Sequence, residues 1–195
     1  MESVETLIWA DEIANAVKLL QDGSVILYPT DTIWGLGCAM DSEEAVERIF
    51  RIKQRPRTSP LILLVSSFAM LRKYVNYIHP RLENLLEVHS QPLTVIYDKT
   101  KNIPHYLLND QKSIAIRIVQ DPYTQELIEV LGLPITSTSA NITGHPFPKY
   151  FGEVSSEIIQ QVDFISTYMR ESREERQPSV IVRCDENGEL DFLRM

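Results

Sequence analysis

The stretch RIKQRPRTSPLILLV, residues 51–65, joins the end of a predicted helix to a buried strand. Apolar residues at 45, 46, 49 and 50 share one face of that helix, which we expect to begin with a capping box of Asp41 and Glu44. Pro56 should end the helix near Arg55. The run Leu61–Val65 is apolar on both faces, which is typical of an inner strand in a sheet that helices cover.

The same alternation of helix and strand recurs along the whole chain. Helices are predicted at 11–21, 67–77, 80–88, 123–131 and 152–161, and strands at 24–28, 32–37, 93–97, 113–119, 134–139, 163–167, 178–183 and 190–194. The charged tract 169–177 is predicted to be an exposed, mobile loop. This pattern predicts an α/β fold with a mixed sheet, and because no linker interrupts it we expect residues 1–195 to form a single domain.

Composition and charge exclude several classes of protein. No apolar run approaches the length of a membrane span, and the acidic start of the sequence has no basic region typical of a signal peptide, so a cytoplasmic location is expected. Cys38 and Cys184 are too few for a disulfide scaffold, and the histidines lack the spacing of metal ligands. A net charge of −8 argues against a general nucleic-acid coat but permits a local cationic pocket.

Five cations nevertheless gather within ten residues, namely Arg48, Arg51, Lys53, Arg55 and Arg57. One interpretation is a solvated helix end, where the helix dipole favours positive charge. The other is a site for phosphate or carboxylate, which the fork of an arginine binds in a bidentate manner. The cluster alone does not decide between them.

Two polar stretches follow predicted strands, YPTDTIWGLG at 28–37 and STSANITGHPFP at 137–148. Each has hydroxyl side chains beside glycine, which suits either a hydrogen-bonded turn or the polar floor of a ligand site at the strand ends. The chain has no G-x-S-x-G elbow, no P-loop and no G-x-G-x-x-G turn. A bound nucleotide would therefore need a different arrangement.

Taken together, these segments resemble the YrdC-type threonylcarbamoyl-AMP synthase family from about residue 10 to the C-terminus. The resemblance rests on the order YPTDTIWGLG, IKQRPRTSPLILL, QPLTVI, SIAIRI, ITSTSANITG, PSVIV and a terminal FLR. Its most specific parts are a K-x-R pair, Lys53 and Arg55, and an S-x-N pair, Ser139 and Asn141. The implied fold is a twisted open mixed sheet covered by helices, around a large central cavity.

The resemblance implies adenylyl transfer from ATP to the carbamate of threonine. L-threonine, bicarbonate and ATP, the last with Mg²⁺, would give threonylcarbamoyl-AMP and pyrophosphate. A tRNA-modifying transferase complex would then pass the threonylcarbamoyl group to an adenosine of tRNA. The family also implies possible binding of double-stranded RNA, and it gives no reason to expect a metal held by the protein itself or any contact with a membrane.

The resemblance also implies roles for individual residues, although none as a general base. ATP would be bound by Lys53, Arg55, Ser113, Ser139, Asn141 and Arg194, and threonine by Thr32, Arg117, Ser137 and Ser179. Ser59, Leu64 and Phe147 depart from residues common in the family. Two alternatives stay open: a non-catalytic RNA-binding or ribosome-associated module, and a paralogue that uses a different acyl or carbamoyl substrate.

Overall fold

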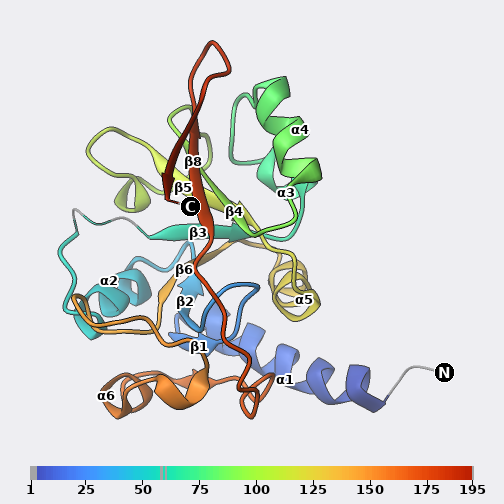
Figure 1. Ribbon diagram of the computed structural model, residues 1–195. Helices are drawn as coiled ribbons and strands as arrows, with labels where there is room; N and C mark the ends of the chain where they lie inside the picture. Colours follow the sequence, from blue (N-terminus) through green and yellow to red (C-terminus); the bar gives the residue numbers. More distant parts are fainter. Residues whose placement is uncertain (1–3, 58, 60, 195) are drawn as a thin grey trace.

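The computed structural model describes residues 4–57, 59 and 61–194 (Figure 1). Its strands are β1 Ile26–Tyr28, β2 Gly35–Ala39, β3 Ile62–Val65, β4 Leu93–Tyr97, β5 Ile114–Ile118, β6 Ile135–Ser139, β7 Phe164–Ile165, β8 Val180–Cys184 and β9 Leu190–Arg194. Its α-helices are α1 Val4–Gln21, α2 Glu43–Ile52, α3 Phe68–Leu71, α4 Pro80–Val88, α5 Pro122–Leu131 and α6 Ser156–Ile159. Short 3₁₀ helices, η1 His105–Leu107 and η2 Phe151–Glu153, complete the described elements.

All of these strands join one mixed sheet in the order β7-β1-β2-β6-β3-β5-β4-β8-β9. The pairs β1–β7, β3–β5 and β4–β8 are parallel, and the other neighbours are antiparallel. This arrangement confirms the predicted α/β fold with a mixed open sheet. The order also places β3, the strand of the opening sequence, between β6 and β5, where both of its edges are paired.

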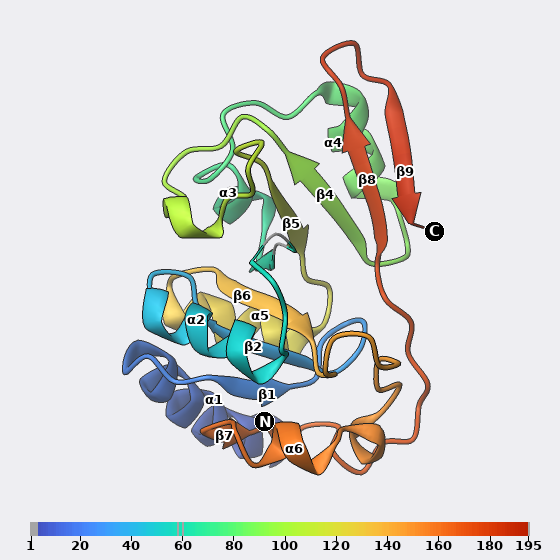
Figure 2. The same ribbon diagram turned by 90° about the vertical axis from the view of Figure 1, so that its left-hand side faces the viewer.

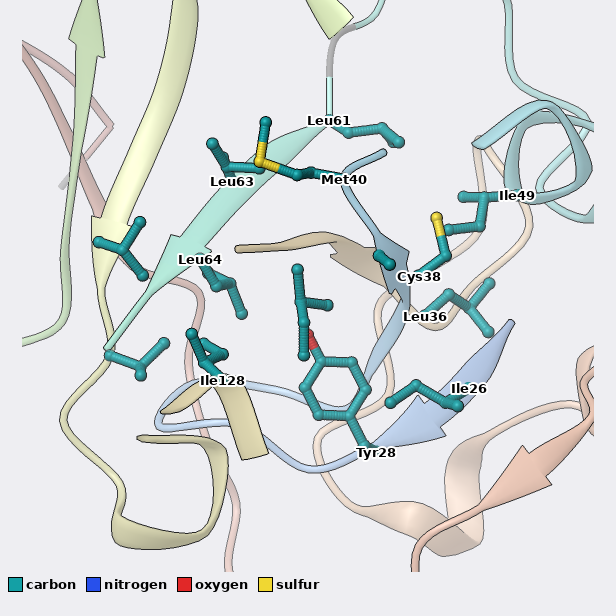
Figure 3. Packing of buried hydrophobic residues seen from close by; sticks show 14 of the residues in the cluster. Ile26, Tyr28, Leu36, Cys38, Met40, Ile49, Leu61, Leu63, Leu64 and Ile128 are labelled. Carbon is teal, nitrogen blue, oxygen red and sulfur yellow. The ribbon is translucent and has the colours of Figure 1, made fainter. Parts of the chain in front are cut away.

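Helices cover the middle of the sheet and bury its apolar side chains. Helices α1 and α2 pack on β2, α5 packs on α1 and β3, and α3 packs on β3 and β5. Figure 3 shows Tyr28, Leu64 and Ile128 meeting in this core from β1, β3 and α5. Full burial of large apolar side chains of this kind stabilises the fold by about 1.5–3 kcal/mol each. The core therefore holds in place the strands whose ends form the site.

Several helices begin or end at other residues than the sequence predicts. The N-cap of α2 is Ser42 rather than Asp41, because the Ser42 hydroxyl accepts a hydrogen bond from the backbone of Ala45. The same helix ends at Ile52, since Gln54 adopts a left-handed conformation with φ of 50°. The helix predicted at 67–77 is only the short α3, and the one predicted at 152–161 is divided into η2 and α6.

The predicted strand at 32–37 begins instead at Gly35, and the preceding residues form a turn. Gly37 shows why this strand needs glycine, since a Cβ atom there would lie 2.7 Å from the ring of Tyr28 and 2.9 Å from the carbonyl oxygen of Thr136. The strands β1 and β6 therefore pack closely against β2. This close packing brings the turn before β2 near the end of β6.

Residues 167–179, named here the edge segment, connect β7 to β8 along one side of the molecule (Figure 2). It has no regular structure, as predicted for most of its length, but it makes specific contacts. Arg176 donates to the carbonyl oxygen of Thr30 at 2.6 Å, and Arg170 lies 4.8 Å from the centre of the Phe151 ring. The first contact holds the edge segment beside the turn between β1 and β2, and the second holds it beside η2.

Candidate functional site

A cavity of about 420 Å³ lies where the ends of β2, β3, β5 and β6 approach β8 and β9. Eight of the ten predicted binding residues line it: Thr32, Arg55, Arg117, Ser137, Ser139, Asn141, Ser179 and Arg194. They come from segments far apart in the sequence, so the fold brings them together. A wider hollow of about 890 Å³ adjoins it and shares Phe147, Pro178 and Arg194 with it.

The cavity is positively charged although the protein is acidic. Three guanidinium groups line it, those of Arg55, Arg117 and Arg194, and the described lining residues include no Asp or Glu. The chain as a whole carries a net charge of −8. Cations gathered within low-dielectric walls concentrate their field on a bound anion. Asp31 lies outside this lining and offsets part of the charge of Arg117, and the positive charge that remains suits an anionic ligand.

Hydrogen bonds to described residues help to hold the Arg55 guanidinium group in place. Its Nε donates to the carbonyl oxygen of Ser59 at 2.9 Å, and its Nη1 donates to the Thr138 hydroxyl at 3.1 Å. Partial burial lowers the pKa of Arg55, but arginine stays cationic at neutral pH. The backbone of Ser59, a predicted departure from the family, thus helps to orient a cation that lines the cavity.

Arg117 lies on β5, where it is paired in register with Leu64 of β3 and Thr94 of β4. It is only 4% exposed. Its Nη2 forms an ion pair with the Asp31 carboxylate at 3.0 Å. A buried arginine that lines a cavity is well suited to bind a carboxylate or phosphate through its remaining donors.

Ser179 joins the third guanidinium to the sheet. Its hydroxyl lies 2.7 Å from the hydroxyl of Thr94, and it also accepts a hydrogen bond from Arg194 Nη2 at 3.2 Å. Arg194 Nε donates to the carbonyl oxygen of Ser179 at 2.9 Å. Partial burial lowers the pKa of Arg194, and the nearby charge of Arg117 lowers it further. Arg194 is thereby fixed even though it is nearly the last residue.

The turn between β1 and β2 supplies hydroxyl groups in a fixed arrangement. The hydroxyls of Thr30 and Thr32 lie 2.9 Å apart, and the Thr30 hydroxyl donates to the carbonyl oxygen of Ile33 at 3.0 Å. Across the sheet, Gly35 of this strand is paired with Ser139 of β6. A Cβ atom at Gly35 would lie 3.0 Å from the Ser137 hydroxyl, so glycine keeps this wall open.

Lys53 and Ser113 are not among the described residues that line the cavity. Lys53 is 1% exposed and donates to the backbone carbonyl oxygen of Asn141 at 2.7 Å and also to that of Ser139. Burial, with a smaller contribution from Arg55, lowers the pKa of Lys53 to about 7. Ser113 is fully buried, and its hydroxyl accepts a hydrogen bond from the Asn109 amide at 2.8 Å.

The five cations of the basic cluster therefore do not form one phosphate site, because their side chains make different kinds of contact. Arg48 forms an ion pair with Asp163, and Arg57 forms one with Glu47. Among its described members, only Arg55 lines the cavity. Both sequence interpretations are therefore partly right, since the cluster contains surface ion pairs as well as a cavity cation.

Only part of the apolar wall of the cavity was predicted from the sequence, namely Trp34, Leu64 and Phe147. The wall consists of Ile62, Leu64, Ile96, Ala115 and Ile181, with Trp34 and Phe147 beside them. The register pairs Ile62 with Ala115, and Ala115 with Ile96, so these side chains share one face of the sheet. Leu64 and Phe147, two departures from the family, both line this cavity.

The match to a known family now agrees with this geometry. Residues 18–195 match the Sua5, YciO and YrdC family model, which carries the description "Telomere recombination". The chain is also 35% identical over 155 residues to the threonylcarbamoyl-AMP synthase of Pseudoalteromonas translucida, an alignment that covers 78% of this chain and 83% of the relative. The chain belongs to the Sua5/YciO/YrdC family.

Solved structures of the Sua5/YciO/YrdC family have the same fold. Escherichia coli YciO is 29% identical, with a TM-score of 0.82 over 94% of this chain and 88% of that one. Pyrococcus abyssi Sua5 complexed with L-threonine is 28% identical, with a TM-score of 0.81 over 93% of this chain. Our chain spans only about half, 53%, of that Sua5 protein. The predicted family and fold are therefore confirmed.

Proposed function

We propose that this protein is a threonylcarbamoyl-AMP synthase, which makes threonylcarbamoyl-AMP and pyrophosphate from L-threonine, bicarbonate and ATP. The observation that carries the proposal is the cavity in which Arg55, Arg117 and Arg194 meet with no Asp or Glu among the described lining residues. A triphosphate and a carbamate are both anionic, and the reaction requires them to lie side by side. Family membership and the curated relative support the same activity.

We assign threonine and ATP to different residues of the cavity lining. Arg117, Thr32, Ser137 and Ser179 offer donors for the carboxylate and hydroxyl of threonine, beside the apolar wall that would receive its methyl group. Arg55, Ser139, Asn141 and Arg194 would bind the phosphates of ATP. A direct contact of ATP with Lys53 or Ser113 stays a prediction.

The proposed reaction proceeds in two steps that require little covalent chemistry from the protein. The threonine nitrogen forms a bond to the carbon of CO₂ or bicarbonate, releasing a proton, or water in the case of bicarbonate, and leaving a carbamate. A carbamate oxygen then attacks the α-phosphorus of ATP, and the bond to pyrophosphate breaks. The guanidinium groups stabilise the negative charge of this transition state, and the apolar wall limits the access of water to the carbamate.

Magnesium is expected to arrive with ATP. The described lining has no carboxylate, and the described residues contain no group of three or more His, Cys, Asp or Glu that could hold a metal. We expect the ATP oxygens to be the main ligands, which is usual for Mg²⁺ with nucleotides. When bound, the ion neutralises charge on the phosphates.

Several wider expectations accompany this proposal. The product carries the threonylcarbamoyl group in an activated form, so we expect a tRNA-modifying transferase complex to consume it in the synthesis of threonylcarbamoyladenosine. The continuous sheet supports the single-domain organisation of residues 1–195. No helix in the described part of the chain is long and apolar enough to cross a membrane. A cytoplasmic location and direct binding of double-stranded RNA stay predictions.

The test is pyrophosphate release from ATP with Mg²⁺ and bicarbonate, measured separately with each of the common amino acids. Release that requires both threonine and bicarbonate supports the synthase. Release with a different amino acid would favour the paralogue, for which Leu64 and Phe147 in the cavity are the relevant departures. An absence of release with all of them would contradict the synthase and favour the non-catalytic alternative.

A further inference from the structure

Asp31 carries a buried carboxylate that the family resemblance did not assign. Its Oδ1 atom forms an ion pair with Arg117 Nη2 at 3.0 Å, a contact that does not have hydrogen-bond geometry, and the two side chains are each only 5% exposed. Its Oδ2 atom accepts a hydrogen bond from the backbone nitrogen of Gln120 at 3.0 Å. Burying two charges incurs a desolvation penalty that often cancels their attraction, so stability alone explains such a pair poorly.

The ion pair fixes one side of the Arg117 guanidinium and leaves another side available. Arg117 lines the cavity, and its Nε atom is buried without a hydrogen-bond partner in the described structure. An unpaired buried donor is unfavourable unless a ligand accepts from it. A guanidinium group is planar, so contact with Asp31 at one nitrogen restricts the direction in which the other donors point.

Asp31 also connects two parts of the site that are distant in the sheet. It lies in the turn between Thr30 and Thr32, after β1, whereas Arg117 lies on β5. Three strands, β2, β6 and β3, separate β1 from β5 in the sheet. The contacts of Asp31 with Arg117 and Gln120 therefore fix the turn between β1 and β2 relative to Arg117.

We propose that Asp31 is a positioning residue, which holds Arg117 in the orientation that binds the carboxylate of the amino-acid substrate. This inference rests on the proposed function, because it assumes that the anion at Arg117 is an amino acid. Asp31 does not line the 420 Å³ cavity, although it lines the adjoining hollow, and its link to the cavity is the ion pair with Arg117. The proposal predicts a defect specific to the amino acid and its carboxylate, with ATP binding preserved.

The test is calorimetric binding of L-threonine, with L-threonine amide as a probe that lacks the carboxylate. Asp31→Asn should weaken binding of threonine roughly tenfold or more, the effect expected if Arg117 no longer aligns a hydrogen bond with the substrate carboxylate. Binding of the amide should change much less. The ratio of the dissociation constant of the amide to that of threonine should therefore be smaller in Asp31→Asn than in the wild type. The Michaelis constant for ATP should stay within about twofold of the wild-type value, the scatter expected for a group that does not touch ATP.

Asp121→Asn is the matched control. Asp121 is the N-cap of α5, where it accepts a hydrogen bond from the backbone of Thr124, and asparagine can cap equally well. This control removes the same charge nearby without touching Arg117. A thermal unfolding midpoint should be recorded for each variant, and Asp31→Ser serves as the second variant if Asp31→Asn does not fold.

A double-mutant cycle separates positioning from a general effect. If Asp31 acts through Arg117, then Asp31→Asn should produce no further loss of threonine binding once Arg117→Met is present. Additive losses, or an Asp31→Asn variant that binds threonine as Asp121→Asn does, would overturn the proposal. Failure of the wild-type protein to bind threonine would also overturn it. A wild type that binds threonine but releases no pyrophosphate would instead contradict the proposed function alone, and these binding measurements would still decide the role of Asp31.

Discussion

The ammonium group of Lys53 lies 2.7 Å from the backbone carbonyl oxygen of Asn141 and ties the residue after α2 to the loop after β6. The Lys53 carbonyl oxygen in turn accepts a hydrogen bond from the backbone of Thr143 at 2.9 Å. The K-x-R and S-x-N pairs that characterise the sequence are thus one structural unit. Lys53 holds the loop, while Arg55, Ser139 and Asn141 line the cavity.

Replacing Lys53 by methionine should therefore destabilise the protein. The change leaves the buried carbonyl groups of Ser139 and Asn141 without their shared donor, which should lower the free energy of unfolding by about 1–3 kcal/mol. Urea unfolding measures this loss. Lys73→Met removes an exposed lysine and is the control. An equal stability of the two variants would show that the Lys53 contacts contribute nothing.

The same lysine should give the stability a particular pH dependence. Burial lowers its pKa to about 7 from an ordinary value of 10.5, so between these values the folded protein binds fewer protons at Lys53 than the unfolded chain. Its contribution to the free energy of unfolding should then rise as the pH increases through that window. Urea unfolding at several pH values should show wild type gaining stability relative to Lys53→Met. A difference that does not change with pH would contradict the lowered pKa.

Arg55→Ala should reduce kcat/KM for pyrophosphate release, because one oriented cation is removed from the developing charge on the phosphates. A loss of transition-state stabilisation of about 2–4 kcal/mol is typical for such a group, which corresponds to roughly 30- to 1000-fold. Arg51→Ala is the matched control, since Arg51 belongs to the same basic cluster but is exposed on α2. Equal activity of both variants would remove Arg55 from the proposed site.

Gly37→Ala should destabilise the sheet without adding bulk to the cavity wall. The new Cβ atom would approach the ring of Tyr28 at 2.7 Å and the backbone oxygen of Thr136 at 2.9 Å. Such overpacking costs about 1–3 kcal/mol, measurable as a lower denaturation midpoint. Gly35→Ala should have a smaller effect, because its closest neighbour is the rotatable Ser137 hydroxyl at 3.0 Å. A larger effect at Gly35 would contradict the packing described for β2.

Arg176→Gln should loosen the edge segment. The wild-type guanidinium donates to the Thr30 carbonyl oxygen at 2.6 Å and thereby connects this segment to the turn that carries Thr32. Hydrogen exchange of residues 168–177 should become faster in the variant, since fewer contacts oppose local opening. Glu171→Gln, an exposed change in the same segment, is the control. Unchanged exchange in Arg176→Gln would show that this contact does not restrain the segment.

Much of this architecture follows from local sequence patterns. Strand β3 and the bounds of α4 and β4 were predictable. In these segments the spacing of apolar residues indicates the element, and residues that end helices or strands lie at its bounds. The short α3 and the divided η2–α6 region were not, because their lengths depend on packing and on turns that the periodicity does not report. Family resemblance placed eight of ten residues at the cavity, which composition and spacing could not have done.

The direction in which each side chain points could not be predicted from the sequence. Lys53 and Arg55 are two residues apart, yet the first bonds to the backbone of Asn141 and the second lines the cavity. The pairing of Asp31 with Arg117 joins residues that are 86 positions apart and no local pattern predicts it. Asp31 could have been noticed as the charged residue within YPTDTIWGLG, but its partner needed the sheet order.

The most direct test of the central claim is to follow ¹³C-labelled bicarbonate into the product by mass spectrometry, with ATP, Mg²⁺ and L-threonine present. The proposed reaction should yield an adenylate that contains both threonine and the labelled carbon. This adenylate should form in step with pyrophosphate and should be absent when threonine is omitted. Pyrophosphate release that yields an adenylate without the label, or no adenylate at all, would contradict the claim that this cavity activates a threonine carbamate.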